Sequence, residues 1–181
     1  MQDKVCPVRY SWALNNKFRL LSHNPQKIMG DYIKKGYVVA DIGCGPGFFS
    51  ISLAQMVGEE GRVIAVDLQQ GMLDQLKALA EQKNLDSRIT LHQCKEDRIG
   101  INEKVDFVLA FWMVHEVPNI KAFFDEVCTM LKPEGLFLMV EPKFHTNASM
   151  FQGEIDQACA AGLKPYKDIK VSLSRAILFS L

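Results

Sequence analysis

The sequence lacks a surplus of charge of either sign, because 21 Lys and Arg residues balance 21 Asp and Glu residues. It also lacks a long hydrophobic run, since the longest, residues 107–114, is far shorter than the roughly 20 apolar residues that span a bilayer. The N-terminus has no basic segment followed by an apolar one, so a secretory signal is not indicated. These absences argue against a membrane span and against a nucleic-acid partner, and they predict a cytoplasmic protein.

Cysteine pairs at metal-binding spacing are missing as well. The five cysteines are far apart, with no CxxC pair and no Cys/His cluster: Cys6, Cys44, Cys94, Cys128 and Cys159. This pattern indicates reduced thiols and no structural metal. What is present is an ordinary globular composition, with 48% hydrophobic and 23% charged residues in a chain of 181, which is the usual size of one domain.

Short apolar runs alternate with stretches of helical period after residue 36, which is typical of an α/β fold with a mainly parallel sheet. Strands are expected at 37–42, 62–67, 89–93, 105–111, 135–140, 165–171 and 173–180. Helices are expected from Pro25 to Gly36 and at 48–57, 72–80, 120–131 and 148–161. Because only a residue or two around Ser172 separates the last two strands, they are expected to pair as a tight antiparallel hairpin.

A glycine-rich turn, Asp41-Ile-Gly-Cys-Gly-Pro-Gly47, follows the first expected strand and opens the helix at 48–57. Glycines suit a sharp turn at which the backbone approaches a ligand. Asp67 ends the next strand, where a carboxylate can accept both hydroxyls of a ribose. Phe48 replaces the third glycine of a dinucleotide fingerprint, and Asp41 would repel a diphosphate but suits the cationic amino group of a methionine moiety. A nucleoside carrying an amino acid is therefore favoured over a dinucleotide.

From residue 24 to 181 the chain resembles the class I methyltransferases that use S-adenosylmethionine (SAM), specifically the small-molecule type that includes the ubiquinone/menaquinone C-methyltransferases. The resemblance rests on four segments: DIGCGPGFFS, AVDLQQGML, VDFVLAFWMVHEVP and LKPEGLFLMVEP. It implies a Rossmann-like, doubly wound sheet of seven strands in the order 3-2-1-4-5-7-6, with strand 7 antiparallel and helices on both faces. It also implies methyl transfer from SAM to a small-molecule acceptor, with release of S-adenosylhomocysteine (SAH).

The resemblance also assigns cofactor-binding residues. It places the turn that includes Asp41, Gly43, Cys44, Gly45 and Gly47 around the methionine end of SAM. Asp67 then binds the ribose, Leu68 contacts the adenine, and the Phe111 backbone lies near the methionine end. The family's usual adenine-binding Asp is Lys95 here, and a lysine cannot accept that hydrogen bond, so Glu96, Asp97 or a backbone carbonyl is expected to take its place.

The acceptor is expected over the ends of the fourth and fifth strands, where His115, Glu141 and His145 lie. His115 is the candidate general base, because an imidazole titrates near neutral pH; the alternative is a structural or substrate-orienting histidine. Glu141 and His145 are candidate acceptor contacts. The three residues could together ligate a metal, but their spacing matches no compact metal motif. Glu116, by contrast, is interpreted as a surface or capping residue.

Residues 1–35 form a separate segment ahead of the core at 36–181 in what we predict to be one domain. The segment mixes aromatic with basic side chains, carrying seven Lys and Arg against two Asp. We expect it to be a helical lid that packs across the carboxyl ends of the strands, with Trp12 against the acceptor and Arg9, Arg19 or His23 able to pair with an anionic one. The alternative is a packing helix on the outer face of the sheet.

Other functions share parts of this pattern. A nicotinamide-dependent oxidoreductase would have the same turn and ribose acid, but it would want glycine where Phe48 stands. An RNA or protein methyltransferase would be expected to show a basic stripe or an added recognition domain. A non-catalytic subunit that retains the fold would have less need of an intact cofactor turn.

Overall fold

The computed structural model describes residues 22–181 and contains a seven-stranded sheet in the order β3-β2-β1-β4-β5-β7-β6. Strands β1 to β5 run parallel, whereas β7 is antiparallel to both β5 and β6. This order and the antiparallel seventh strand confirm the expected topology. The strands are β1 (Val38–Ile42), β2 (Arg62–Asp67), β3 (Ile89–Gln93), β4 (Val105–Phe111), β5 (Leu131–Pro142), β6 (Lys164–Asp168) and β7 (Ser174–Ser180).

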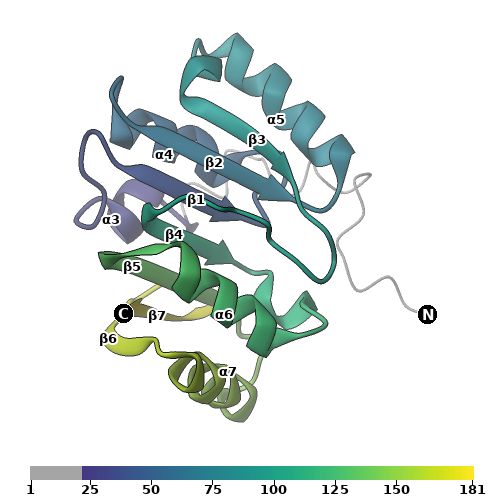
Figure 1. Ribbon diagram of the computed structural model, residues 1–181, viewed down its shortest axis with the longest axis vertical. Coiled ribbons are helices and arrows are strands. Elements are labelled where there is room, and N and C mark those ends of the chain that lie inside the picture. Colours follow the sequence, from purple (N-terminus) through teal and green to yellow (C-terminus); the bar gives the residue numbers. More distant parts are fainter. Residues whose placement is uncertain (1–21) are drawn as a thin grey trace.

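Helices cover both faces of the sheet (Figure 1). One face is packed by α3 (Pro25–Met29), α4 (Phe48–Val57) and α5 (Gln70–Gln82), and the other by α6 (Ile120–Met130) and α7 (Ala148–Ala161). The chain therefore winds outward from β1 on one face and outward from β4 on the other. In such sheets a ligand binds where the winding reverses, beyond the carboxyl ends of the two central strands.

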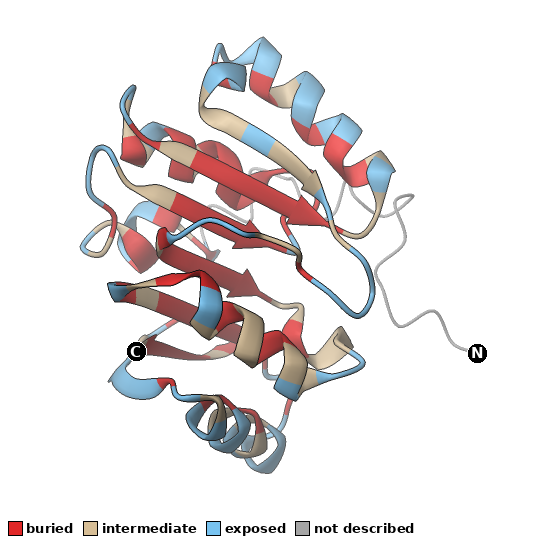
Figure 2. Ribbon diagram, viewed as in Figure 1, coloured by how far each residue is buried: buried red, intermediate tan, exposed pale blue. Residues whose placement is uncertain are grey.

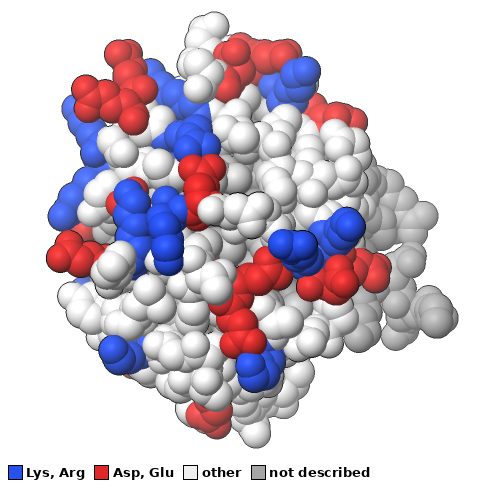
Figure 3. All heavy atoms as spheres, in the orientation of Figure 1, with Lys and Arg blue, Asp and Glu red and all other residues white. Residues whose placement is uncertain are grey.

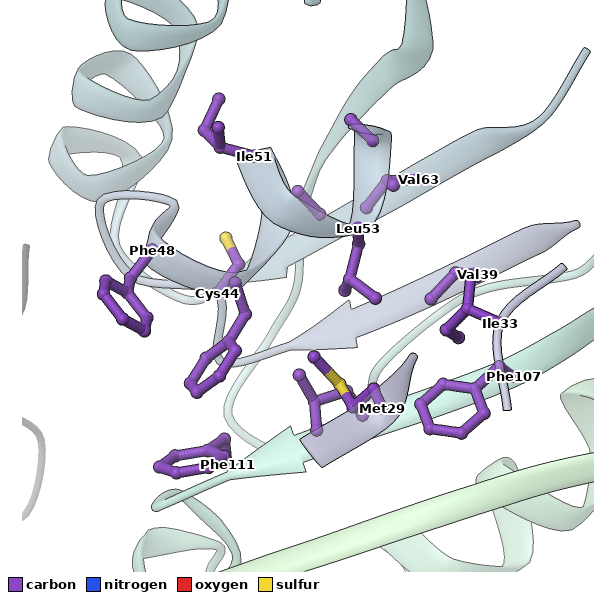
Figure 4. Packing of buried hydrophobic residues seen from close by; sticks show 14 of the residues in the cluster. Met29, Ile33, Val39, Cys44, Phe48, Ile51, Leu53, Val63, Phe107 and Phe111 are labelled. Atoms are coloured by element: carbon purple, nitrogen blue, oxygen red, sulfur yellow. The ribbon is translucent and has the colours of Figure 1, made fainter. Parts of the chain in front are cut away.

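The central strands are buried on both faces, as Figure 2 shows by the red of β1, β2 and β4. Their near-continuous Val, Ile and Phe content is what a parallel sheet between two helical layers requires. On the α4 face Met29, Leu53 and Phe107 converge from a helix, a second helix and a strand (Figure 4). The helices begin as their sequences indicate: Asn119 and Asn147 accept the backbone N–H groups of Ala122 and Met150 through their side chains.

The last two strands pair antiparallel, as expected, but the connection between them is longer than the predicted tight turn. β6 ends at Asp168 and β7 begins at Ser174, so residues 169–173 connect them. Val171 turns inward and is buried, and Leu173 adopts a positive φ of 56°, which ends the extended backbone. The apolar residues 169 and 171 had indicated a strand, but they pack against the core from a loop.

Two helix boundaries also differ from expectation. The helix at Pro25 is capped by the side chain of Asn24, which accepts the backbone N–H of Lys27, but it ends at Met29 instead of continuing to Gly36, because Gly30 and Asp31 are poor helix formers. The helix at 120–131 ends one residue early, since Leu131 already begins β5. The register of β5 against β4 then shifts between Val105 and Phe107, which accommodates residues 132–135 as a bulge.

Helix α3 does not pack across the carboxyl ends of the strands, as we expected of a lid. Its Ile28 and Met29 are buried in the same cluster as Leu53 and Phe107, so α3 lies on the face of the sheet beside α4 (Figures 1 and 4). This arrangement follows from its apolar side, which is buried against the strands. The remaining lid residues, 1–21 with Trp12 among them, lie outside the described part of the chain. Between residues 22 and 181 the structure contains no helix that could span a membrane.

Candidate functional site

The glycine turn after β1 needs backbone conformations that only glycine adopts readily. Gly43, Gly45 and Gly47 have φ values of 72°, 53° and 97°. A Cβ atom on Gly43 would lie 2.9 Å from the side chain of Met113, and one on Gly47 would lie 2.3 Å from Cδ1 of Leu76. The turn is therefore packed tightly against the end of β4 on one side and against α5 on the other.

Asp67 ends β2 directly beside this turn. Its Oδ2 accepts the backbone N–H of Gly45 at 2.9 Å, and its Oδ1 accepts that of Gln69 at 2.8 Å. Burial raises the pKa of Asp67 above its usual value, although these backbone N–H groups act in the opposite direction. The carboxylate is thus fixed in place next to the glycine turn, as a ribose-binding acid needs to be.

The other two polar side chains of the turn are buried. Oδ2 of Asp41 accepts a hydrogen bond from the Ser50 hydroxyl at 2.5 Å, which ties the end of β1 to α4. The Cys44 thiol donates to the carbonyl of Gly45 at 3.5 Å. Burial, followed by the charges of Asp41 and Asp67, raises the pKa of Cys44 well above its usual value, so this thiol is not a nucleophile at neutral pH.

A cavity opens between the end of β2 and the segment that follows β4. Four of the predicted cofactor residues line it: Gly43, Asp67, Leu68 and Glu96. The rest of the wall comes from Ile42, Cys94, Lys95, Asp97, Arg98, Ile99, Met113, Glu116, Val117, Pro118, Asn119, Phe123 and Glu126. Lys95 and Arg98 exchange backbone hydrogen bonds and so hold the loop after β3 against this cavity. The cavity thus joins the ends of β1 and β2 to the loop after β3, the segment after β4 and α6.

Phe111 belongs instead to an aromatic group on the α4 face. Its ring lies 4.3 Å from that of Phe49 and 5.3 Å from that of His23, measured between centroids. Trp112 follows with a positive φ of 61°, and its Nε1 donates to the Ser174 hydroxyl at 2.9 Å. Trp112 had no predicted role, and His23 was expected only to be able to pair with an anionic acceptor. Their contact joins residues 89 positions apart, which local patterns do not reveal.

His115 and Glu141 form a hydrogen-bonded pair at the ends of β4 and β5. Glu141 is fully buried; its Oε2 is bonded to Nδ1 of His115, and its Oε1 accepts the backbone N–H of Val114 at 3.0 Å. Burial alone would lower the pKa of His115, but the hydrogen bond and charge of Glu141, with smaller effects of Glu116 and Glu154, raise it above 6.5. The ring of His145 stacks on that of His115 at 5.3 Å. The three predicted acceptor residues are therefore brought together.

Glu116 was wrongly interpreted as a surface or capping residue. Its side chain is only 24% exposed and lines the cavity, with Oε1 4.0 Å from Nε2 of His115. Burial, with the charges of Glu141 and Asp67, raises the pKa of Glu116 to about 7 against the opposing effect of His115. His115 itself is not part of the cavity wall. The sequence indicated only that Glu116 follows the end of a strand. That position does not distinguish a solvent-exposed loop residue from one that lines a cavity.

No group of three or more His, Cys, Asp or Glu side chains among residues 22–181 is arranged to hold a metal ion. On the face shown in Figure 3, Lys and Arg side chains are interspersed with Asp and Glu. The cavity, by contrast, has five acidic side chains and two basic ones in its wall. Its chemistry therefore favours a ligand with positive charge.

A doubly wound sheet with this strand order, a glycine turn at the reversal and an acid at the end of β2 defines the class I methyltransferase fold. The sequence profile of the family described as "Methyltransferase domain" matches residues 33–172. The chain belongs to that family.

Curated relatives with sequence similarity are described as demethylmenaquinone methyltransferases. The protein of Lactobacillus johnsonii is 31% identical over 116 residues, which cover 64% of this chain and 48% of the relative. One from Bacillus cereus is 28% identical over 123 residues, which cover 68% of this chain and 52% of the relative. The chain thus spans about half the length of the curated relatives that it matches.

Solved structures share the fold at lower sequence identity. A SAM-dependent methyltransferase from Aquifex aeolicus superposes with a TM-score of 0.87 at 22% identity, over 97% of this chain and 98% of that one. Fibrillarin from Aeropyrum pernix, solved with natively bound SAM, superposes with a TM-score of 0.68 at 14% identity, over 89% of this chain and 74% of that one. These likenesses establish the fold.

Proposed function

We propose that this protein transfers a methyl group from SAM to a small organic acceptor and releases SAH. The observation that carries the proposal is the placement of Asp67 beside the glycine turn, in one cavity with Gly43, Leu68 and Glu96. A bound SAM would supply an electrophilic methyl group on a sulfonium. The acid excess of the cavity and the close backbone at Gly43 fit a cationic nucleoside.

In this proposal the residues of the turn position the cofactor. Asp67 accepts hydrogen bonds from the ribose hydroxyls, which replace part of its present bonding to the backbone N–H groups of Gly45 and Gln69. Leu68 covers the adenine, and Glu96 accepts from its amine. Asp41, Cys44, Gly45 and Gly47 shape the methionine end, with the Phe111 backbone opposite. Positioning of this kind can contribute up to roughly 7–11 kcal/mol toward the rate of a two-body reaction.

We assign His115 as the general base that removes the acceptor's proton. Glu141 accepts a hydrogen bond from Nδ1–H of His115, which fixes the tautomer of the ring. Nε2 is then the nitrogen that can take the proton of the acceptor. Because Glu141 is fully buried, it acts on the acceptor only through His115. His145, stacked on the same ring, forms one side of the acceptor site in this assignment.

The names of the curated relatives point to a demethylated quinol as the acceptor class. A quinol suits a base such as His115, because loss of a hydroxyl proton raises the electron density of the ring carbon that is methylated. We further propose that the protein acts in the cytoplasm without a nucleic-acid partner, and that residues 1–24, which precede α3 and include Trp12, cover the acceptor side of one domain.

The acceptor assignment is tested by incubating the protein with methyl-labelled SAM and a water-soluble demethylated naphthoquinol. Label in the carbon skeleton of the quinol, with SAH formed in equal amount, supports the proposal. SAM turnover only with transfer RNA or a protein acceptor would replace the small molecule by a macromolecule. Binding of NADH in place of SAM would overturn the cofactor assignment.

A further inference from the structure

The side chains of the short 3-10 turn Val114–Glu116 and of Met113 before it lie in two environments, the cavity wall and the protein interior. Residues three apart on such a turn project to the same side, so Met113 and Glu116 both line the cavity. The two residues between them point elsewhere: Val114 is fully buried on the α6 and α7 face, and His115 is bonded to Glu141. Glu116 is thus held toward the cofactor cavity by the packing of its neighbours.

Several charged side chains of the cavity wall and of neighbouring elements lie around Glu116. Asp67 lies across from it on β2, and Lys95, Glu96, Asp97 and Arg98 come from the loop after β3. Two more charged groups complete the surroundings: His115 on the same turn, and Glu141 on β5 behind it. Glu126 on α6 also lines the cavity, but its carboxylate is occupied by the backbone N–H groups of Ile99 and Gly100.

Glu116 changes charge in the physiological pH range, because burial raises its pKa to about 7. A positive charge that enters the cavity favours the carboxylate and expels its proton, whereas a neutral ligand does not. The sulfur of the cofactor is bonded to C5′, one carbon beyond the ribose ring that Asp67 is proposed to bind. A cofactor whose ribose was held by Asp67 would place that sulfur within the cavity whose wall Asp67 and Glu116 share.

We propose that Glu116 distinguishes the charged cofactor from the spent one by pairing with the sulfonium of SAM, and that it loses this contact when the product is SAH. The inference rests on the proposed function. During transfer the C–S bond breaks with its electron pair left on sulfur, a new bond forms from the acceptor to the methyl carbon, and the acceptor's proton is released. The sulfur becomes a neutral thioether, Glu116 regains a proton, and the hold on the product weakens.

The experiment is calorimetric titration with SAM and with SAH, in buffers of different ionisation enthalpy at pH 7, which counts the protons released on binding. Wild-type protein should release a fraction of a proton with SAM and less with SAH. Its preference for SAM over SAH should increase roughly twofold to fivefold between pH 6 and pH 8, the size expected of one partly buried charge pair. Glu116→Gln should remove both the difference in protons and the pH dependence of the preference.

Glu154→Gln is the matched control. Burial also raises the pKa of Glu154 to about 7, but Glu154 lies on α7 and is not part of the cavity wall. This variant should therefore keep the proton release and the preference of the wild type. Persistence of both properties in a folded Glu116→Gln protein, judged by circular dichroism, would overturn the inference while leaving SAM binding intact. Failure of the wild type to bind either ligand would instead overturn the proposed function.

Discussion

At the scale of single residues, Asp67 is the side chain on which the cofactor assignment most depends. Replacing it in Asp67→Ala removes the acceptor for the ribose hydroxyls, so SAM binding should weaken by about 1–3 kcal/mol. Calorimetry measures the change directly. Asp74→Ala, at an exposed carboxylate on α5, controls for loss of negative charge. Equal affinity of the two variants would show that Asp67 does not bind the ribose.

His115 gives a second prediction at this scale. A base must be deprotonated to act, and Glu141 raises the pKa of His115, so kcat should increase with pH through a value above 6.5. His115→Asn keeps a donor for Glu141 but removes the base, and it should lower kcat by about 10²–10⁴-fold. The pH–rate profile should then lose its acidic limb. An unchanged profile would assign His115 a purely structural role between β4 and β5.

Single residues also show where sequence reasoning succeeds. Gly43 and Asp67 could be placed from the sequence, because a turn and a strand end fix their positions by local rules. Glu116 could not, since its exposure depends on whether Val114 or Met113 turns into the core. The environment of His115 depended likewise on Glu141, a residue of another strand 26 positions away.

At the scale of elements, the glycine turn should be intolerant of side chains. Gly45→Val places a β-branched residue at a φ of 53° and disturbs the N–H that holds Asp67, so it should abolish SAM binding and lower stability by roughly 1–3 kcal/mol. Urea denaturation and calorimetry measure the two effects. The matched variant Gly153→Val lies in α7 with open space around it and should retain binding. Retained binding in both would show that the cofactor lies elsewhere.

Elements also differ in how far the sequence predicts them. β1, β2, β3 and β4 were located to within a residue, because their runs rich in apolar residues are bounded by turns and belong to a parallel sheet. The connection between β6 and β7 was not located correctly. Val171 is apolar because its side chain packs into the core from a loop, and not because it belongs to a strand. Helix α3 was expected to be longer and to lie across the carboxyl ends of the strands. The apolar side of a helix does not by itself indicate which surface of the protein that helix covers.

At the scale of the whole molecule, buried acids should make stability depend on pH. Burial raises the pKa of Glu116 and Glu154 to about 7, so the folded state holds protons that the unfolded state loses above about pH 4.5. Their contribution to stability is complete below that value and is lost as the pH rises through 7. His115, with its raised pKa, contributes in the same direction above pH 6.5.

Glu154→Gln isolates one of these contributions. Oε2 of Glu154 is buried without a hydrogen-bond partner within residues 22–181, so its ionisation is costly in the folded protein. The variant should gain on the order of 1 kcal/mol relative to wild type between pH 5 and pH 8, after allowance for partial solvent screening. Urea denaturation at both pH values measures this difference. A constant difference would mean that Glu154 ionises as freely in the folded protein as in the unfolded chain.

A crystal structure of the protein with SAH bound would test the cofactor assignment most directly. We predict the nucleoside in the cavity between β2 and the segment after β4, with the ribose hydroxyls about 2.6–3.2 Å from the Asp67 carboxylate and with Glu116 on the same cavity wall. A nucleoside bound elsewhere, with Asp67 still bonded only to the backbone of Gly45 and Gln69, would contradict it.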